Sequence, residues 1–200
     1  MNAMAPKPRA ADDWYVEEPR CTHQLLAVEP IYGLTLDPAC GQGNIVHALR
    51  ELNIPAYGSD IKDRGMNPEW FIGECDFLNW TPVVRPQNIV CNPPFFRGVG
   101  TEAFIRRALA LATRKVCIFT EARFLFGDGR AATLYSEFPP DRIWIITPRP
   151  SCPPGEFIVN GGKVGGGTPD FVWLVWDNDL PISRRGMSMT GWARPVAAKE

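Results

Sequence analysis

The chain has few histidines, no paired-cysteine motif and no excess of either charge. Its 200 residues include two histidines and six cysteines, and no two cysteines have the C-x-x-C spacing that binds a structural zinc ion. We therefore expect no metal site, and free thiols rather than disulfides. The formal net charge of −1 excludes a strongly basic nucleic-acid coat protein.

A long apolar run is also missing. No uninterrupted stretch approaches the ~20 apolar residues of a membrane-spanning helix. Four acids, Asp12, Asp13, Glu17 and Glu18, stand where a secretory signal has its apolar core. The expected location is therefore the cytoplasm. The hydrophobic share of 45% and charged share of 22% are typical of a globular domain.

Short apolar segments alternate with helical patterns along the chain. The expected helices are 44–52 and 101–112, the second with Thr101 as its N-cap. A Pro- and Gly-rich stretch, 149–170, is predicted to be a long functional loop. Such alternation predicts an α/β fold with a mostly parallel sheet. The expected strands are 34–37, 56–60, 70–75, 88–91, 116–120, 142–147 and 171–176.

A glycine turn follows the first predicted strand. Gly41 and Gly43, spaced by one residue, permit a tight turn and close approach of a ligand to the backbone. A dinucleotide fingerprint would need a third glycine where Val46 stands. Asp37 suits a cationic group better than a pyrophosphate, so the pattern indicates a zwitterionic ligand. A purely structural strand-to-helix turn is the alternative.

Acids also follow the next two predicted strands. Asp60 ends the second strand, where nucleotide-binding folds place an acceptor for ribose hydroxyls. Asp76, followed by Phe77, ends the third, where a carboxylate is suited to accept an adenine amino hydrogen. Each acid alone is more often a turn residue, but three such strand ends beside one glycine turn favour a nucleoside ligand.

The fourth predicted strand ends at Asn92-Pro93-Pro94-Phe95. Consecutive prolines cannot continue a strand ladder and form a stiff extended turn. The Asn92 amide oxygen and the Pro93 carbonyl are two acceptors suited to an exocyclic –NH2 group, and Phe95 offers a face for a planar base. A capped Pro-Pro turn without function is the alternative.

These two motifs together resemble class I S-adenosylmethionine-dependent methyltransferases. Residues 37–43, Asp-Pro-Ala-Cys-Gly-Gln-Gly, look like their motif I, and Asn92-Pro93-Pro94-Phe95 looks like motif IV of DNA N6-adenine enzymes. The stretch 14–26 resembles their N-terminal cofactor-lining motif, and 165–177 resembles small phage and prophage adenine methyltransferases. The resemblance implies a cytoplasmic protein of a bacterial or phage-infected cell.

The resemblance implies a three-layer α/β/α Rossmann-like fold, with a mostly parallel seven-stranded sheet and an antiparallel last strand. It also implies a flexible N-terminus at 1–13, a methyltransferase domain at 14–177 and a tail at 178–200. Asn92, Pro93, Pro94 and Phe95 would hold the target base. Cys152 stands where the family often has a supporting aromatic, with Phe157 further on. The implied S-adenosylmethionine-binding residues are Thr22, Asp37, Pro38, Ala39, Gly41, Gly43, Asp60, Ile61, Asp76, Phe77 and Asn92.

The implied activity is methyl transfer to adenine N6 in DNA, with base flipping. RNA adenine-N6 or guanine-N2 methylation is the first alternative; protein glutamine N5 methylation or a non-catalytic binding module is the second. The expected partner is nucleic acid, and the protein is expected to be a monomer or homodimer. The first hundred residues carry a net charge of −4 and the second hundred +3, which favours nucleic-acid contacts in the second half. A length of 200 residues leaves little for a separate recognition domain, so we expect short-site recognition.

Overall fold

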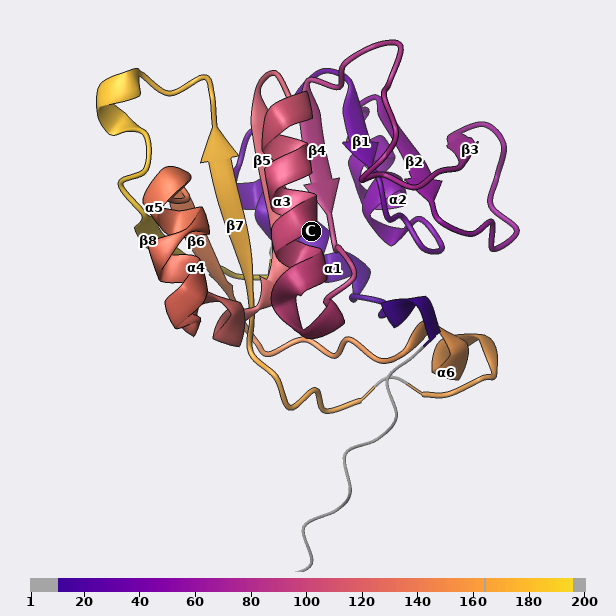
Figure 1. The fold of residues 1–200 in the computed structure, drawn as a ribbon. Helices are drawn as coiled ribbons and strands as arrows, with labels where there is room; N and C mark the ends of the chain where they lie inside the picture. The colour runs from indigo at the N-terminus through magenta and orange to yellow at the C-terminus, as the bar shows by residue number, and fades with distance from the viewer. Residues whose placement is uncertain (1–10, 164, 196–200) are drawn as a thin grey trace, which may run out of the picture.

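One mixed sheet forms the centre of the molecule. The computed structural model describes residues 11–163 and 165–195, in which eight strands follow the order β3-β2-β1-β4-β5-β7-β6-β8 (Figure 1). The strands are β1 (Thr35–Asp37), β2 (Ala56–Asp60), β3 (Phe71–Glu74), β4 (Asn88–Cys91), β5 (Lys115–Glu121), β6 (Arg142–Ile146), β7 (Phe171–Asp177) and β8 (Met189–Ala193). Strand β7 runs antiparallel to β5 and β6, and the other pairings are parallel.

The predicted α/β fold is therefore confirmed, with eight strands in place of the predicted seven. The additional strand, β8, pairs with β6 in parallel and lies within 178–200, where a tail was expected. The sheet thus continues past the predicted domain boundary at residue 177. Sequence reasoning missed β8 because it is an edge strand in which only Ala193 is buried, so no apolar alternation marks it.

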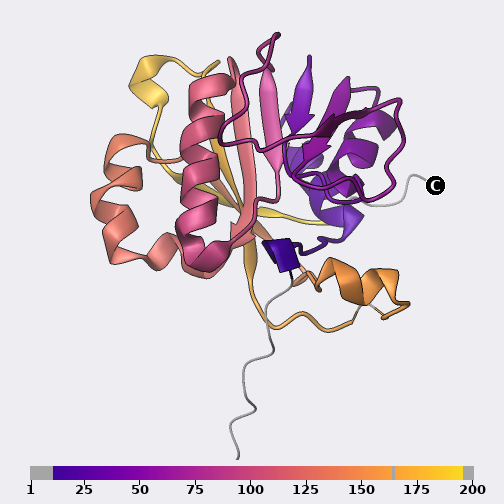
Figure 2. The same cartoon turned by 45° about the vertical axis from the view of Figure 1, so that its right-hand side comes forward.

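Helices cover both faces of the sheet (Figures 1 and 2). Residues of α1 (Pro19–Val28) and α2 (Asn44–Glu51) share one buried cluster with Cys117 and Phe119 of β5, whereas residues of α3 (Val99–Leu111) share the other with Val116 and Ile118 of the same strand. This alternation is what a strand buried on both faces requires. The helices are α1 (Pro19–Val28), α2 (Asn44–Glu51), α3 (Val99–Leu111), α4 (Asp128–Ala132), α5 (Leu134–Glu137) and α6 (Gly155–Val159). No helix of the described residues is long and apolar enough to cross a bilayer.

The predicted N-cap of α3 was wrong. The helix begins at Val99 with Gly98 as its N-cap, and Thr101 lies buried inside the first turn. Its hydroxyl donates a hydrogen bond to the Pro94 carbonyl at 3.4 Å. The helix starts earlier because the 3₁₀ turn Phe96–Gly98 leads directly into it, and Gly98 takes the left-handed conformation at φ +90°.

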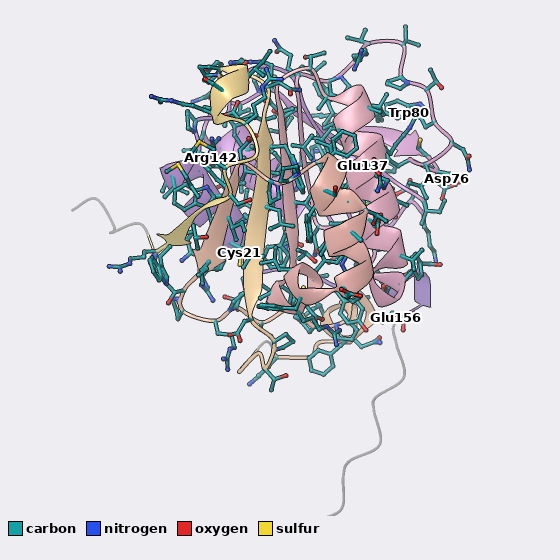
Figure 3. All side chains as sticks on the ribbon, turned by 60° about the vertical axis from the view of Figure 1, so that its left-hand side comes forward. Cys21, Asp76, Trp80, Glu137, Arg142 and Glu156 are labelled. Atoms are coloured by element: carbon teal, nitrogen blue, oxygen red, sulfur yellow. The ribbon has the colours of Figure 1, made fainter. Side chains whose placement is uncertain are left out.

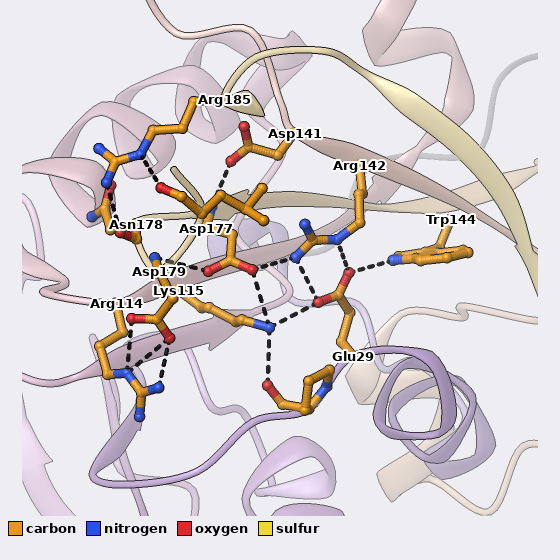
Figure 4. Close-up of polar contacts among 12 residues, drawn as sticks. Glu29, Arg114, Lys115, Asp141, Arg142, Trp144, Asp177, Asn178, Asp179 and Arg185 are labelled. Carbon is orange, nitrogen blue, oxygen red and sulfur yellow. Dashed lines mark hydrogen bonds and ion pairs between the residues drawn. The ribbon is translucent and has the colours of Figure 1, made fainter. Parts of the chain in front are cut away.

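A buried ion network lies at the end of the sheet where the parallel strands begin, here called the network edge (Figure 4). Glu29, at the end of α1, contacts Lys115 at 3.0 Å and Trp144 Nε1 at 2.7 Å. Asp177, at the end of β7, contacts Lys115 at 3.3 Å and Arg142 at 2.6 Å. Arg142 also binds Glu29. Four charged side chains from α1, β5, β6 and β7 thus compensate one another.

Candidate functional site

A cavity of about 450 Å³ lies at the opposite edge of the sheet, where β1, β2 and β4 end. Two of the predicted site residues, Thr22 and Gly43, are not part of its wall. The predicted residues that line it are Asp37, Pro38, Ala39, Gly41, Asp60, Ile61, Asp76, Phe77, Asn92, Pro93, Pro94 and Phe95.

The two glycines of the turn have different surroundings. Gly41, at φ +53°, lines the cavity, and an added Cβ would lie 2.7 Å from Trp14 Nε1. Gly43, at φ +88°, is the N-cap of α2, and an added Cβ would lie 2.4 Å from the Trp70 ring. Gly41 therefore shapes the wall, whereas Gly43 permits α2 to pack closely on Trp70.

Asp60 holds the turn in place. Its Oδ2 accepts a hydrogen bond from the Gly41 N–H at 2.8 Å. Its Oδ1 accepts from the Lys62 N–H and from Arg64, both at 3.1 Å. The Arg64 guanidinium in turn lies 4.3 Å from the Trp14 ring centroid. A carboxylate has about four acceptor sites, so these three bonds leave room for a further donor from a ligand.

Asp76 and Phe77 lie on the β3 side of the cavity. Asp76 accepts hydrogen bonds from the Leu78 N–H at 3.1 Å and from Asn79 Nδ2 at 2.6 Å. Figure 3 shows Asp76 and Arg142 on opposite sides of the molecule. Phe77 is buried and packs against Phe104, with ring centroids 5.0 Å apart. The wall at Asp76 therefore combines an apolar ring with a carboxylate.

Thr22 lies in α1, away from the cavity wall. Its side chain is fully buried, and its hydroxyl has no hydrogen-bond partner in the described part of the chain. The structure therefore does not bring Thr22 to the other predicted cofactor residues, and its proposed contact with the methionine carboxylate stays a prediction.

Residues 12–17, here called the N-terminal strap, form one wall of the cavity. The Val16 N–H donates to the Pro153 carbonyl at 2.9 Å, and the Gly155 N–H donates to the Trp14 carbonyl at 3.0 Å. These bonds join the strap to the segment that carries α6, which lies beside it in Figure 1. Sequence reasoning missed Asp12 and Asp13 as wall residues because only these long-range bonds define the strap. The sequence feature that could have marked them as site residues is the pair of acids, Asp12 and Asp13, close before Trp14.

Asn92 is held by the strap through one end of its amide. Its Nδ2 donates to Glu17 Oε2 at 2.7 Å and to the Tyr15 carbonyl at 3.0 Å. Within residues 11–163 and 165–195, no hydrogen bond reaches Asn92 Oδ1 or the Pro93 carbonyl. The site therefore offers two acceptor oxygens next to each other in sequence that the protein leaves unused.

Four buried carboxyl groups give the cavity an acidic character: Asp13, Glu17, Asp37 and Asp60. Burial raises the pKa of Glu17 to about 7, against the lowering effect of the Asn92 hydrogen bond. Burial, together with the neighbouring charge of Glu17, raises the pKa of Asp37 well above its usual range. Arg64 binds Asp60, so the pair Glu17 and Asp37 favours a cationic ligand.

Phe95 also lines the cavity. Its ring meets Phe124 edge-on at 6.3 Å, and the Arg123 guanidinium lies 5.1 Å from its centroid. Cys152 also lines the cavity, with its Sγ 3.9 Å from Asn92 Nδ2, and burial raises the pKa of this thiol. Thr120 Oγ1 is buried in the wall without a hydrogen-bond partner in the described part of the chain.

Solved structures with the same fold include several methyltransferases. A proposed RNA methyltransferase of Pyrococcus horikoshii matches with a TM-score of 0.61 and 12% identity, over 86% of this chain and 90% of its own. A proposed class I S-adenosylmethionine-dependent methyltransferase of Listeria monocytogenes matches with a TM-score of 0.56 and 10% identity, over 86% of this chain but only 62% of its own.

A third match has its cofactor bound. Magnesium protoporphyrin IX methyltransferase of Synechocystis with bound S-adenosylmethionine has a TM-score of 0.50 and 16% identity, over 78% of this chain and 76% of its own. No protein-family model matches the chain, and no curated protein matches it in sequence. These likenesses show the class I methyltransferase fold, while the substrates differ among its members.

Proposed function

We propose that this protein transfers a methyl group from S-adenosylmethionine to the exocyclic N6 amine of adenine in DNA. The observation that carries the proposal is the Asn92 amide, whose nitrogen is bound by Glu17 and Tyr15 while its oxygen is unused. Together with the Pro93 carbonyl, it gives the cavity two acceptors for the two hydrogens of an –NH2 group. Phe95 then supplies an aromatic face for the base.

The cavity suits S-adenosylmethionine. Gly41 keeps the turn open beside Trp14, and Asp60 and Asp76 provide acceptors at the ends of β2 and β3. The buried carboxyls of Glu17 and Asp37 favour a positive charge. The partnerless hydroxyl of Thr120 offers one further polar contact. Asp60 and Asp76 would hold the nucleoside, and Glu17 and Asp37 would face the positively charged part.

The chain's residues contribute binding and orientation, because the methyl group is already activated. When bound, S-adenosylmethionine supplies a methyl group whose C–S bond breaks as the amine lone pair forms the new N–C bond, leaving a neutral thioether. Asn92 and Pro93 draw the amino hydrogens out of the base plane, which frees that lone pair for attack. Asn92 cannot act as a base, so the extra proton leaves to water after transfer.

DNA is the proposed polymer and RNA the alternative. The Asn-Pro-Pro-Phe motif is specific for nitrogen in a planar system and does not distinguish the two polymers. The Pyrococcus horikoshii neighbour, a proposed RNA methyltransferase, supports RNA as the alternative. A base in a duplex must leave the stack at a cost of a few kcal/mol, to which stacking on Phe95 would return ~1–3 kcal/mol.

The test is tritiated methyl transfer from S-adenosylmethionine to duplex DNA, single-stranded DNA and RNA in parallel, with digestion of each product to nucleosides. We expect N6-methyl-2′-deoxyadenosine from DNA. The variant Asn92→Ala should keep cofactor binding within about threefold and lose at least about 100-fold in kcat, because it loses an acceptor made for the transition state. Incorporation into RNA alone would favour the alternative substrate.

Two results would refute the proposal. Firm cofactor binding without incorporation into any nucleic acid would indicate a non-catalytic module. Unchanged kcat in Asn92→Ala would remove Asn92 from the reaction. Asn178→Ala is the matched control, since Asn178 follows β7 at the other edge of the sheet.

A further inference from the structure

We propose that Glu17 is a positioning residue, which fixes the end of the Asn92 amide that meets the substrate. The inference rests on the proposed function of this site. Glu17 Oε2 accepts from Asn92 Nδ2 at 2.7 Å, and the Tyr15 carbonyl accepts from the same nitrogen at 3.0 Å. Both acceptors belong to the N-terminal strap, at least 75 residues away from Asn92 in sequence.

The orientation matters because the two ends of an amide have the same shape and opposite hydrogen-bonding character. A half-turn about the last side-chain bond exchanges an acceptor oxygen for a donor nitrogen. An ionised carboxylate and a carbonyl only accept, so the strap binds the –NH2 end alone. The turned amide would set Oδ1 against two acceptors and present a donor to the substrate amine, which it cannot bind productively.

Ionisation of Glu17 controls how strictly this orientation is held. A protonated Glu17 has an O–H that can donate to Oδ1, and the turned amide then becomes tolerable. Burial raises the pKa of Glu17 to about 7, with the Asn92 bond opposing that rise. The productive orientation should therefore be held most firmly above neutral pH and lose population as pH falls.

The groups that face Glu17 come from three elements and from the loop before α6. Cys21 of α1, Cys91 of β4 and Cys152 before α6 all have a pKa raised by burial, so they remain neutral thiols near pH 7. Asp37 of β1 faces Glu17 as well, and its pKa is raised by burial and by Glu17. The strap's next neighbour, Glu18, is instead turned toward Arg20 and the Ser151 N–H. The negative charge of ionised Glu17 therefore opposes ionisation of Asp37.

Kinetics of two variants test the proposal with the nucleic acid that the methylation assay identifies. Glu17→Ala should lower kcat about 10- to 100-fold, the range for a lost hydrogen bond to a charged group, and leave the S-adenosylmethionine Kd within about threefold. Wild-type kcat should rise with pH on a limb centred near the Glu17 pKa of about 7. Glu17→Gln, which keeps size and an acceptor, should retain more activity than Glu17→Ala and lack that limb.

Two further variants test whether Glu17 is the group whose ionisation makes kcat rise with pH. Glu51→Gln changes an exposed glutamate at the far end of α2 and should keep both kcat and the limb. Asp37→Asn should keep the limb, because burial and not Asp37 raises the pKa of Glu17. A Glu17→Ala variant with wild-type kcat, or a Glu17→Gln variant that keeps the limb, would overturn the proposal.

A second readout needs no catalysis, and it separates failure of this inference from failure of the proposed function. In the ¹⁵N-labelled full-length protein, the side-chain amide signals of Asn92, assigned by their loss in Asn92→Ala, should shift with a midpoint near pH 7 in wild type and stay constant in Glu17→Gln. Coupled signals without methylation of any nucleic acid would refute only the function. Methylation of a nucleic acid, together with Asn92 amide signals whose pH dependence is the same in wild type and Glu17→Gln, would refute only the positioning role.

Discussion

Asp37 is a buried carboxyl with no ion-pair partner among the residues that the structure describes. Its pKa is raised well above the usual range, first by burial and then by Glu17. A bound cation would reverse this effect and favour the ionised form. At the residue scale, Asp37 should therefore distinguish the sulfonium of S-adenosylmethionine from the neutral thioether of S-adenosylhomocysteine.

Asp37→Asn should weaken S-adenosylmethionine about 10-fold or more, since it removes a charge-assisted contact, and weaken S-adenosylhomocysteine much less. Titration calorimetry with both ligands measures the difference, and wild-type affinity for S-adenosylmethionine should increase as pH rises and Asp37 ionises. Asp128→Asn, an exposed acid at the start of α4, is the control. Equal losses for both ligands would show that Asp37 does not face the positive charge.

At the scale of elements, the start of α2 depends on a conformation that only glycine adopts readily. Gly43 combines φ +88° with a position where an added Cβ meets the Trp70 ring at 2.4 Å. Gly43→Ala should destabilise the fold by about 2 kcal/mol or more, from left-handed strain of ~1 kcal/mol and from overpacking of ~1–3 kcal/mol. Urea denaturation measures the change.

Gly65→Ala separates the two costs. Gly65 has φ +79° and no atom within 4 Å of an added Cβ, so this variant carries the strain without the overlap and should lose about half as much. If both variants lose the same amount, the Trp70 contact contributes nothing to the requirement for glycine.

The elements that sequence reasoning predicted are those with a dense local signal. Strand β4 matched its prediction because four consecutive buried residues end at two prolines. Helix α2 matched because its apolar stripe is regular. The short helices α4 and α5, five and four residues long, have too few turns to show a period. The strap and β8 depend on pairing with residues distant in sequence, for which local composition holds no signal.

The same distinction applies to the site. The motifs at strand ends supplied twelve of the residues that line the cavity, because parallel strands bring their carboxyl ends to one edge. The Asn92–Glu17 bond was not predictable, since it depends on how the strap is held by Pro153 and Gly155. Thr22 was assigned by family resemblance alone, and in the structure it is buried and is not part of the cavity wall.

At the scale of the whole molecule, the two edges of the sheet hold carboxyl groups with opposite pKa shifts. At the network edge, burial alone would raise the pKa of Glu29, but its bonds to Arg142, Trp144 and Lys115 outweigh burial and lower it. The pKa of Asp177 is also lowered, because its contacts with Arg142 and Lys115 outweigh the effect of burial. At the cavity edge, the pKa of Glu17 and that of Asp37 are raised.

Opposite shifts give opposite slopes of stability against pH. The lowered carboxyls contribute stability above their unfolded values of 4.5 and 3.8, and this is lost as pH falls toward their folded pKa. The Glu17 carboxyl has a raised pKa in the fold. It therefore favours folding below its unfolded pKa of 4.5, and this contribution is lost as pH rises through about 7. Integrated over the Glu17 shift, the loss is about 3 kcal/mol. The free energy of unfolding should therefore be greatest at about pH 4 to 5 and should already decline by about pH 6.

Each slope should respond to a different variant. Glu17→Gln should flatten the decline on the alkaline side, since no carboxyl at position 17 must ionise there.

Lys115→Met should destabilise the protein by about 3–5 kcal/mol, because it leaves buried carboxylates short of a cation, and should flatten the acid side. Arg106→Met, in a partly exposed pair on α3, should leave both slopes intact. Chemical denaturation from pH 3 to 9 measures all four proteins, and a wild-type maximum above pH 8 would mean that the Glu17 carboxyl ionises in the fold without cost.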